Sequence, residues 1–578
     1  MVSERKKFKL DRISALAIVI FILGCFLVLQ LFNIQVVRGE VYTALASGQH
    51  KIYQNLNPTR GQIFIKRNDY NINNNLYPIA TNEKRHEIYA IPEKITNPVK
   101  LSREVAQILN LNEEELKAKF IKEDDPYEPV LKYATDEQVA QVKALESPGL
   151  GFVPQDFRLY PEANIYGHLT GFLGFDENRR VGQYGLEGAA EEILAGQEGK
   201  LSLETDTLGN WIPTSKKDIV KEAIPGSHLV LTIDNAIQFN ACFALKEGVE
   251  KYGADSGSIA IMDPKTGAIL ALCGYPDFDP NNYSKVEDIN VYKNQVVAES
   301  YEPGSIFKPI TMAAALDSLS VTPETTYDDT GEVKIDVYTL RNSDQKAHGI
   351  RNMIQVLEES LNTGAIFAMR QAGQEVFTDY VKKFNFGKPT GISLSPESPG
   401  DISSLDKRGE IYAATASYGH GITATPLQML TAYTAIANGG ILVKPYIIAE
   451  TINPDGSKTK TEPKSLGRVL SAKTASNLSA ILVSVIRNGH AGKAGVTGYY
   501  VGGKTGTALV PKKDARGYSD LTIHSFVGFA PVDNPRFLAI VKLDHVKNVS
   551  YAADSTGPIF GKIAKFILNY YEIPPDEG

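Results

Sequence analysis

The first hydrophobic pattern along the chain is an uncharged, mostly apolar run over residues 13–32. A helix of this length, at about 1.5 Å per residue, spans roughly 30 Å, the thickness of a bilayer core. Basic residues precede the run, at Arg5, Lys6, Lys7, Lys9 and Arg12. Because positive flanks stay in the cytoplasm, we predict a cytoplasmic tail over residues 1–12, a transmembrane helix over residues 13–32 and an extracytoplasmic remainder.

A cleaved signal peptide is the alternative interpretation of this run. Residues 44–46, Ala-Leu-Ala, resemble a cleavage site. Signal sequences have shorter apolar regions of about 7–15 residues, however, and this site lies well beyond the run. We therefore interpret the run as an uncleaved anchor. Apolar residues then recur at a loose helical spacing, which predicts a stem over residues 33–52.

Over residues 53–224, short strand patterns alternate with helical ones. The predicted strands include 62–65 and 86–91, and the predicted helices include 101–109, 113–120 and 135–145. Turn residues separate these elements, and Pro225-Gly226 marks the next boundary. We predict a separate domain with both strands and helices for this region.

The pattern changes again over residues 225–578. Strands are predicted near both ends of this region, at 228–233, 258–262, 268–273, 499–502, 525–529 and 537–543. Helices are predicted at 234–252, 353–372, 413–417, 426–438 and 559–571. Strands at both ends with helices between them predict an α+β domain, in which one mixed sheet carries an inserted helical subdomain.

Composition narrows the function classes. The chain has 578 residues, of which 43% are hydrophobic and 22% charged, an ordinary globular balance for two or three domains. Its net charge of -7 argues against nucleic acid as the main partner. The three cysteines, Cys25, Cys242 and Cys273, have neither a disulfide-framework nor a metal-ligand spacing. The apolar surroundings of two of them predict buried free thiols.

Candidate chemistry first appears at Ser305 and Lys308. Pro303 and Gly304 end the preceding segment, and an apolar run follows at 310–316. A helix that starts here would place the two side chains on one face, beside free backbone N–H groups. A weak nucleophile, a candidate base and donors for an anion would then share one place. The alternative is that Ser305 is only a helix cap.

The same Ser-x-x-Lys spacing also starts at positions 3, 343, 404 and 457, where the pair would be cytoplasmic or exposed. Two further motifs distinguish the pair at 305. Ser360-Leu361-Asn362 lies downstream in a helix-turn context, and Lys504-Thr505-Gly506-Thr507 ends a strand-like run. An earlier Lys-Thr-Gly, at 265–267, occupies a predicted hairpin turn, and we interpret it as a turn sequence.

Ser-x-x-Lys, Ser-x-Asn and Lys-Thr-Gly occur in this order in serine enzymes that recognise penicillin. The chain resembles a class B penicillin-binding protein, a monofunctional peptidoglycan D,D-transpeptidase, over nearly its whole length. Arg60-Gly61-Gln62-Ile63 and Gly185-Leu186-Glu187 are similar to the opening and closing segments of the family's N-terminal module. Residues 421–428 and 438–440 are similar to the family's segment before Lys-Thr-Gly. The family usually has Asp-Arg-Asn shortly after the opening, whereas residues 66–68 here are Lys-Arg-Asn.

This resemblance implies an elongated, dimerisation-like pedestal domain over residues 53–224 and a penicillin-binding transpeptidase domain over residues 225–578. It implies that Ser305 attacks the bond between two terminal D-alanines of a stem peptide, and that an amine of a neighbouring stem resolves the acyl-enzyme. β-Lactams mimic the same terminus and are expected to acylate Ser305. The compact pedestal favours a role in division over one in elongation.

The expected catalytic residues are Ser305, Lys308, Ser360, Asn362 and Lys504. At an unperturbed pKa near 10.4, only about one lysine in 2,500 is neutral at pH 7. Burial and a second cation at Lys504 would lower the pKa of Lys308 and make it a base. Ser360 would relay the proton to the leaving amine, and Asn362 would hold Lys308 or the peptide amide. Lys504 would stay charged and hold the substrate carboxylate.

The expected substrate-binding residues are Thr505, Gly506 and Thr507. The two threonine hydroxyls would help to bind the carboxylate, and Gly506 would let a peptide lie along the strand. By the resemblance, backbone N–H groups of Ser305 and Thr507 would form an oxyanion hole. No cofactor or metal is expected. The expected partners are peptidoglycan stem peptides, β-lactams, the bacterial plasma membrane, and a SEDS-type glycan polymerase with other cell-wall machinery.

Other classes stay open as alternatives. Residues 498–505 satisfy the Walker A pattern of P-loop nucleotide-binding proteins. The residues that follow are predicted to be strand and loop, however, and not the helix that a P-loop requires. A β-lactam sensor, a D,D-carboxypeptidase or a β-lactamase would keep the same serine site, and an elongation-type transpeptidase would keep the same chemistry.

Overall fold

The computed structural model describes residues 12–38, 51–66, 76–122, 125, 127–176, 179–204, 218–512 and 517–576. Nearly all of the predicted cytoplasmic tail and most of the predicted stem lie outside these residues. The chain forms two compact units, one of residues 1–58 with 196–225 and one of residues 59–195 with 226–578.

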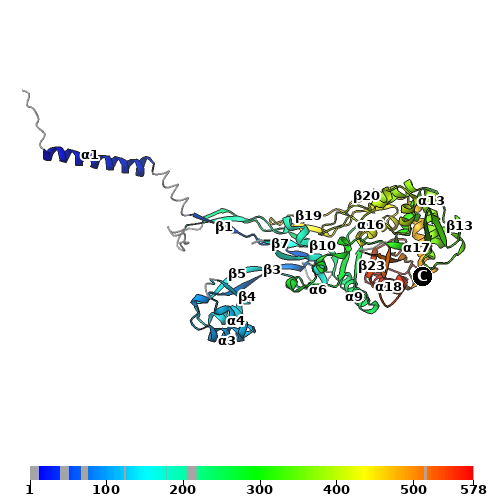
Figure 1. Ribbon diagram of the computed structural model, residues 1–578, viewed down its shortest axis with the longest axis horizontal. Helices are drawn as coiled ribbons and strands as arrows, with labels where there is room; N and C mark the ends of the chain where they lie inside the picture. The colour runs from blue at the N-terminus through cyan, green and yellow to red at the C-terminus, as the bar shows by residue number, and fades with distance from the viewer. Residues whose placement is uncertain are drawn as a thin grey trace, which may run out of the picture. The chain divides into compact units, whose positions relative to one another are not determined.

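The first unit contains the apolar helix α1 (Arg12–Phe32), which continues into a π-helical turn, η1 (Asn33–Val37) (Figure 1). Residues 15–37 form a helix long and apolar enough to cross a membrane, with a mean hydropathy of 2.9 and no burial within the structure. The same unit contains β1 (Lys51–Leu56), which pairs with β8 (Gly199–Glu204), and β9 (Asp218–Lys221), which also pairs with β8.

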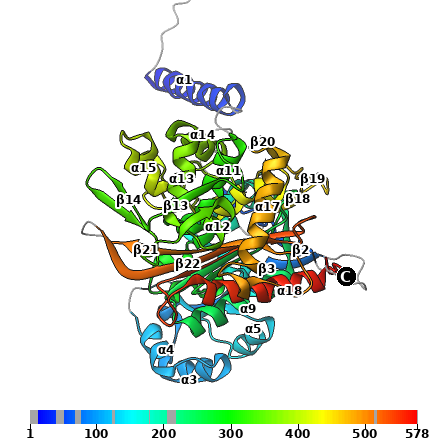
Figure 2. The ribbon, with the colours of Figure 1, turned by 90° about the vertical axis from the view of Figure 1, so that its right-hand side faces the viewer.

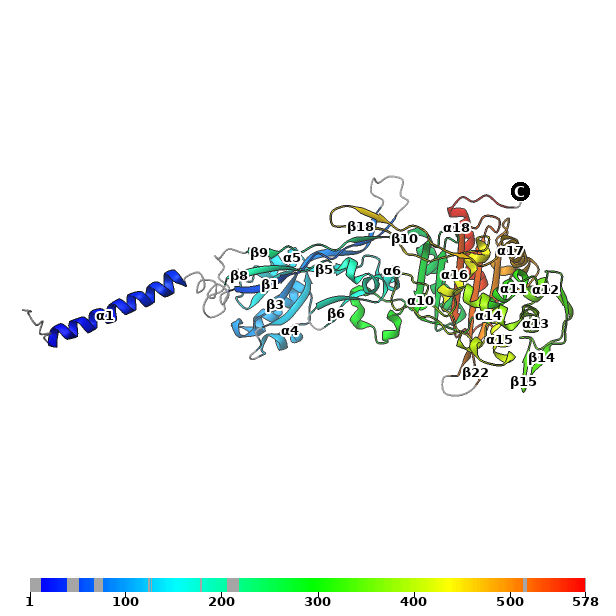
Figure 3. The ribbon, with the colours of Figure 1, turned by 90° about the horizontal axis from the view of Figure 1, so that it is seen from above.

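A long strand, β3 (Leu76–Ala90), organises the N-terminal part of the second unit. Its start pairs with β2 (Ile63–Lys66), and its end pairs with β4 (Glu128–Ala134) and with β5 (Leu150–Leu159), which lies beside β3 in Figure 3. The helices that share a hydrophobic core with the end of β3 are α3 (Pro98–Leu109), α4 (Glu113–Phe120) and α5 (Asp136–Lys143). All three helices were expected from the sequence, whereas the strand predicted at 86–91 is only the end of β3.

The strand β2 also joins this region to the chain after residue 225. It pairs in parallel with β10 (His228–Asp234), and the sheet continues through β18 (Ile448–Ile452) to β19 (Lys458–Lys460). One sheet therefore contains strands from both sides of the boundary predicted at Pro225-Gly226. Between β5 and β8 lie α6 (Ala163–Thr170), β6 (Phe172–Asp176), β7 (Arg179–Gln183), α7 (Gly185–Ala189) and α8 (Glu191–Leu194).

A buried ionic network joins the motif at residues 60–63 to the motif at residues 185–187. Arg60 Nε and Arg158 Nε each donate a hydrogen bond of 2.7 Å to the carboxylate of Glu187, which is fully buried. Burial alone would raise the pKa of Glu187, but Arg158 and Arg60 together lower it below its ordinary value. Gly61 leaves no room for a side chain, because an added Cβ would lie 1.9 Å from the carbonyl oxygen of Ser227.

The last sheet has the order β12-β11-β23-β22-β21, and all its neighbours are antiparallel. Its strands are β11 (Ser256–Met262), β12 (Ile269–Tyr275), β21 (Gly502–Pro511), β22 (Tyr518–Ala530) and β23 (Phe537–Asp544). The helices on its two faces are α9 (Asn235–Tyr252) with α18 (Thr556–Tyr570), and α16 (Pro426–Ala437) with α17 (Ala472–Arg487) (Figure 2). Coverage of both faces explains why β23 is buried along its whole length.

The inserted helical subdomain supplies the remaining elements. Its helices are α11 (Lys308–Asp317), α12 (Met353–Glu358), α13 (Asn362–Ala372), α14 (Gln374–Lys383) and α15 (Glu410–Ala416). Three two-stranded antiparallel sheets also occur in this part of the chain: β13 (Thr326–Asp329) with β16 (Gly349–Asn352), β14 (Glu332–Ile335) with β15 (Tyr338–Arg341), and β17 (Ile441–Val443) with β20 (Ser465–Arg468).

Short helical pieces complete the unit. They are η2 (Pro92–Lys94), η3 (Pro280–Lys285), η4 (Ile289–Tyr292), α10 (Gln295–Ala298), η5 (Gly304–Phe307), η6 (Ser403–Asp406), η7 (Gly492–Ala494) and η8 (Ala552–Asp554). The α+β fold predicted from the sequence, with an N-terminal apolar helix, is confirmed.

Two element predictions are wrong. The helix predicted over residues 353–372 is interrupted between α12 and α13, where Ser360 has a positive φ of 58°. The strand predicted at residues 499–502 begins only at Gly502 and runs through the whole Lys-Thr-Gly-Thr motif. The sequence 499–501 looked strand-like because Tyr and Val favour strands, whereas the sheet actually uses the glycine-rich segment that follows.

The prediction of buried free thiols is wrong for Cys242 and Cys273. Helix α9 packs on β12 and brings these residues into a disulfide, with their Cα atoms 5.3 Å apart. That separation is ordinary for a disulfide. The sequence spacing could not reveal the bond, because it depends on how the helix lies on the sheet. Cys25, in α1, is free and exposed.

Candidate active site

Ser305 lies in the 3₁₀ turn η5, directly before α11. The preceding Gly304 has a φ of 58°, a conformation that favours glycine, and its N–H donates to the carbonyl oxygen of Gly419 at 3.0 Å. On the other side, the Tyr433 hydroxyl donates to the carbonyl oxygen of Ile306 at 2.7 Å. The serine is half-buried, whereas Ile306 and Lys308 are buried. These contacts fix the turn from two sides and leave Ser305 partly accessible, as a nucleophile requires.

Two buried lysines converge on the hydroxyl of Ser360. Lys308 Nζ lies 3.2 Å from Ser360 Oγ and also donates to the carbonyl oxygen of Ser360. Lys504 Nζ donates to the same Oγ at 2.9 Å and to the carbonyl oxygen of Thr505 at 3.2 Å. Both lysine side chains are only 1% exposed. The structure therefore brings one residue of each sequence motif together at a single hydroxyl.

The break between α12 and α13 makes this geometry possible. Ser360 occupies the turn with its left-handed backbone, so that both its carbonyl oxygen and its hydroxyl face Lys308. An uninterrupted helix would hold that carbonyl in an intrahelical hydrogen bond. The positive φ is costly for a residue with a side chain, and such strain is typical of functional sites.

The electrostatics separate the two amines. Burial, together with the positive charge of Lys504, lowers the pKa of Lys308 well below its ordinary value. Burial also lowers the pKa of Lys504, to about 7. In the free site Lys504 is thus only partly charged at neutral pH, which differs from the fully charged residue expected from the sequence. A bound carboxylate would raise its pKa again.

The Lys-Thr-Gly-Thr segment lies at the edge of the sheet, because the strand order ends at β21. Gly506 packs against the serine turn: an added Cβ would lie 2.6 Å from Ser525 Oγ and 3.0 Å from both Ile306 Cγ2 and the Pro303 carbonyl oxygen. Close approach of β21 to η5 therefore requires glycine at 506. The edge strand offers backbone groups to an extended peptide.

This placement also removes the nucleotide-binding alternative. Residues 504–507 lie within β21 and pair with β22, so they do not lead into a helix. A P-loop needs the N-terminus of a helix at this point to hold phosphate. The earlier Lys-Thr-Gly, at 265–267, lies in the turn between β11 and β12, as expected.

The remaining expected site residues have other contacts in the structure. Asn362, at the start of α13, donates from Nδ2 to the carbonyl oxygen of Arg341 at 2.8 Å. That bond ties it to β15, and not to Lys308 as one of the expectations had it. Thr505 and Thr507 are half-buried on β21, and the Thr507 hydroxyl accepts a hydrogen bond of 3.2 Å from the N–H of Ala552.

A polar cluster beside the serine turn was not expected from the sequence. The Tyr518 hydroxyl lies 3.0 Å from Glu302 Oε2 and 3.2 Å from His420 Nδ1, and the N–H of Gly421 donates to Glu302 Oε1 at 2.9 Å. Burial, with the charge of Lys308, lowers the pKa of His420 to about 4, and burial raises the pKa of Glu302. The position of Glu302, three residues before Ser305, was the available signal. No local sequence pattern indicated that Tyr518, at the start of β22, would lie beside Glu302.

This arrangement suits acyl transfer through a serine. It contains a half-exposed hydroxyl at the start of a helix, a buried amine with a lowered pKa three residues away, and a second amine at an edge strand. Such groups can activate a serine, hold an anionic substrate terminus and take up an extended peptide. The fold and the site together define a serine acyltransferase of the penicillin-recognising class.

Comparison with known protein families agrees with this class. Residues 257–565 match the penicillin-binding protein transpeptidase domain, and residues 55–231 match the penicillin-binding protein dimerisation domain. The first match alone covers more than half of the chain. The protein therefore belongs to the class B penicillin-binding proteins.

Individual relatives are similar over nearly the whole chain. Stage V sporulation protein D of Bacillus subtilis is 32% identical over 94% of this chain and 83% of its own length. The peptidoglycan D,D-transpeptidase FtsI homolog of Mesostigma viride is 28% identical over 99% of this chain and 98% of its own. Among solved structures, penicillin-binding protein 3 of Mycobacterium tuberculosis, complexed with aztreonam, is 25% identical, with a TM-score of 0.69 over 90% of this chain and 98% of its own.

Proposed function

We propose that this protein is a peptidoglycan D,D-transpeptidase that works through an acyl-enzyme at Ser305. The observation that carries this proposal is the meeting of Lys308 and Lys504 at the hydroxyl of Ser360, beside the serine turn. Membership of the penicillin-binding family and the names of relatives such as the FtsI homolog support the substrate.

In the first half-reaction, Ser305 Oγ attacks the carbonyl carbon of the penultimate D-alanine. Neutral Lys308 takes the hydroxyl proton as the Oγ–C bond forms. The tetrahedral oxyanion receives hydrogen bonds from the backbone N–H groups of Ser305 and Thr507, each worth roughly 3–4 kcal/mol. The C–N bond then breaks, and the proton passes from Lys308 through Ser360 to the departing amine of the terminal D-alanine.

The substrate is held along β21. Charged Lys504 and the hydroxyls of Thr505 and Thr507 bind the terminal carboxylate, which also restores the charge on Lys504. The peptide backbone adds to the open edge of the strand beside Gly506. Asn362, anchored to Arg341, contacts the peptide amide and not the lysine.

In the second half-reaction, an amine of a neighbouring stem attacks the acyl carbon, and the ester bond to Ser305 breaks. The proton of the amine returns to Ser305 Oγ by way of Lys308. A β-lactam follows the first half-reaction only, because its ring nitrogen stays attached to the acyl group after the ring opens. The same site using water would be a carboxypeptidase, and a site that never turned over would be a sensor.

The membrane arrangement follows from the sequence and one structural feature. The apolar helix at residues 15–37 anchors the chain, and the basic residues before it place the N-terminus in the cytoplasm. The disulfide between Cys242 and Cys273 is typical of an oxidising, extracytoplasmic compartment. Cross-linking of stem peptides needs newly made glycan strands, and as their source we propose a SEDS-type polymerase that acts as a membrane partner during division.

Labelling with a fluorescent penicillin tests the nucleophile. The full-length parent should be labelled, and Ser305→Ala should not. Ser457→Ala is the matched control, because Ser457 also precedes a lysine by three positions but lies in an exposed hairpin. Labelling that persists in Ser305→Ala would assign the nucleophile elsewhere.

Product analysis then separates the related activities. With a synthetic pentapeptide and an acceptor amine, a transpeptidase yields the amide-linked product with release of D-alanine. Hydrolysis alone would indicate a carboxypeptidase, and no turnover would indicate a sensor. Localisation at the septum, as opposed to the side wall, tests the division role.

A further inference from the structure

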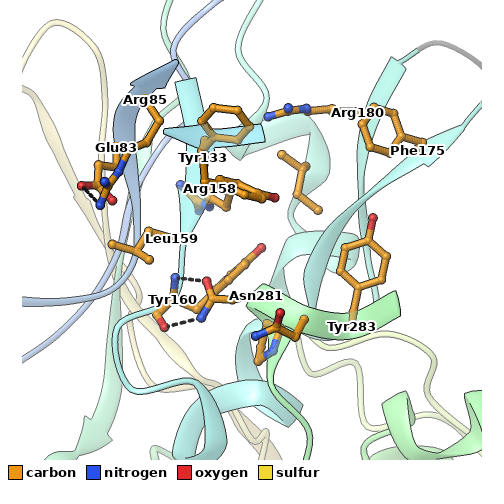
Figure 4. Close-up of a pocket in the computed structure, with 14 residues that line it drawn as sticks. Glu83, Arg85, Tyr133, Arg158, Leu159, Tyr160, Phe175, Arg180, Asn281 and Tyr283 are labelled. Atoms are coloured by element: carbon orange, nitrogen blue, oxygen red, sulfur yellow. Dashed lines mark hydrogen bonds and ion pairs between the residues drawn. The ribbon is translucent and has the colours of Figure 1, made fainter. Parts of the chain in front are cut away.

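A cavity of about 330 Å³ lies in the second unit, apart from the residues that meet at Ser360. It is bordered by β3, β4, β5, β6, β7 and η3 (Figure 4). Its volume is at the lower end of the range for small-ligand sites, roughly 300–1,000 Å³. Three guanidinium groups, those of Arg85, Arg158 and Arg180, and one carboxylate, that of Glu83, line it. Arginines thus outnumber carboxylates in the lining, although Arg85 pairs with Glu83 at 2.6 Å and Arg158 pairs with Glu187 at 2.7 Å.

The best-fixed of these cations is Arg158. Its side chain is 3% exposed, Nε donates to Glu187, and Nη1 donates to Asn82 Oδ1 at 3.0 Å. Nη2 is buried and has no hydrogen-bond partner among the described residues. A buried donor without a partner is destabilising, because it has lost its hydrogen bonds to water. An acceptor that reached this nitrogen would supply the missing hydrogen bond.

Aromatic rings form much of the remaining wall. The guanidinium of Arg180 lies over two of them, 5.2 Å from the ring centre of Phe157 and 5.6 Å from that of Phe175. Phe175 is 58% exposed and Tyr133 is 54% exposed, and both line the cavity. Figure 4 shows Arg180 and Phe175 across the cavity from Arg158. Large exposed rings beside stacked guanidinium groups are typical of binding surfaces.

We propose that this cavity binds a carboxylate-bearing sugar–peptide unit of a peptidoglycan strand. Guanidinium groups match carboxylates by paired hydrogen bonds, and the aromatic faces offer apolar contact to a sugar ring. A peptidoglycan strand carries both groups in every repeat. The choice of ligand rests on the proposed function, because a transpeptidase works among such strands. A strand held at this second site raises the effective concentration of its stem peptides near the same unit.

Binding to the full-length protein in detergent tests the proposal after Ser305 has been acylated with penicillin. The probe is a disaccharide-tetrapeptide prepared from peptidoglycan, titrated by isothermal calorimetry. Saturable binding is expected, at least tenfold weaker for Arg180→Glu and for Phe175→Ala. Both side chains are exposed, so neither change removes a core contact. The same probe with its carboxylates amidated should also bind at least tenfold more weakly.

The matched control is Arg536→Ala, because Arg536 also stacks on an aromatic ring, that of Tyr571 at 5.4 Å, but lies outside the cavity. It should bind like the parent. Absence of binding to the parent, equal binding by both cavity variants, or equal loss in the control would each overturn the proposal. Penicillin labelling of each variant reports its folding. Failure of the parent to be labelled would instead contradict the acyl-enzyme at Ser305, whatever the cavity binds.

Discussion

Lys308 and Lys504 donate to the same hydroxyl, that of Ser360, but they differ in their position and in what lowers their pKa. Lys308 begins α11, three residues after Ser305, and both burial and the charge of Lys504 lower its pKa well below the ordinary value. Lys504 lies on the edge strand where a peptide terminus would bind, and burial alone lowers its pKa to about 7. In the proposed mechanism, acylation needs Lys308 neutral and Lys504 charged at the same time, so the two requirements oppose each other as pH changes.

The pH dependence of acylation follows from this opposition. A raised pH favours neutral Lys308 but removes the charge of Lys504 as it passes about 7. The second-order rate of penicillin labelling should therefore fall on the alkaline side of neutrality. Lys504→Arg keeps a cation at every accessible pH, so its alkaline fall should disappear, whatever its absolute rate.

Labelling rates across neutral pH measure this effect. Lys542→Arg is the control, because Lys542 is also buried, on β23, but that strand is separated from β21 by β22 and Lys542 pairs with Asp544. It should keep the alkaline fall. If the labelling rate of Lys504→Arg still falls at alkaline pH, a group other than Lys504 causes that fall.

Ser360 combines a shared hydroxyl with a left-handed backbone, and two substitutions separate these features. Ser360→Ala and Ser360→Gly both remove the hydroxyl, so we expect both to lower the acylation rate by about 10²- to 10⁴-fold. Glycine tolerates the φ of 58° and alanine does not, so the glycine variant should be more stable, by roughly 1 kcal/mol. Labelling rates and thermal unfolding measure the two effects. Recovery of the rate in Ser360→Gly would assign the loss to backbone strain and not to the proton relay.

At the scale of elements, the site depends on the contact between β21 and the serine turn. Gly506→Ala would place a methyl group 3.0 Å from the carbonyl oxygen of Pro303, a backbone atom that cannot move independently. We expect at least a tenfold slower acylation, because the edge strand would shift away from Ser305. In the control Gly557→Ala, the added methyl meets nothing closer than 3.7 Å, and the rate should not change. Equal rates for both variants would contradict the dependence on this contact.

The sequence revealed more of the site than of the elements that carry it. Side chains from the three motifs do meet, since Lys308 and Lys504 both lie within hydrogen-bonding distance of Ser360 Oγ, and the catalytic roles expected for them stay predictions. The strand through residue 504 was placed too early, since glycines and a lysine are poor local signals for a strand. The break at Ser360 was missed, because the helical pattern continues on both sides of it.

Features that depend on tertiary packing were beyond reach. The disulfide between α9 and β12 and the cluster of Glu302, His420 and Tyr518 join segments with no shared pattern. The parallel pairing of β2 with β10 could not be predicted either, because strands so far apart in the sequence leave no local signal of their pairing. The pairing of β2 with β10 affects more of the molecule than the disulfide or the polar cluster does, because it joins the region before residue 225 to the region after it.

At the scale of the whole molecule, a substitution at the buried Glu187 tests whether the regions before and after residue 225 unfold together. Glu187→Gln would leave Arg158 buried without its carboxylate partner and would leave Arg60 with Glu191 alone, at an expected cost of about 3–5 kcal/mol. In the parent, Arg158 and Arg60 lower the pKa of Glu187, so its stabilisation is complete above the ordinary glutamate pKa of 4.5 and is lost as pH falls further. The stability difference between parent and variant should therefore be largest near neutral pH and shrink in acid.

Urea unfolding of the full-length protein, followed by circular dichroism at neutral and acidic pH, measures this difference. The control is Glu114→Gln, because Glu114 is 80% exposed and its ion pair with Lys117 is worth less than about 1 kcal/mol. Penicillin labelling along the same urea series adds a readout from Ser305. Since β2 and β10 share one sheet and Gly61 packs on Ser227, Glu187→Gln should bring the loss of labelling to lower urea together with the loss of helix signal. Labelling that survives at the parent's urea concentration would mean that the region around Glu187 unfolds without disturbing the active site.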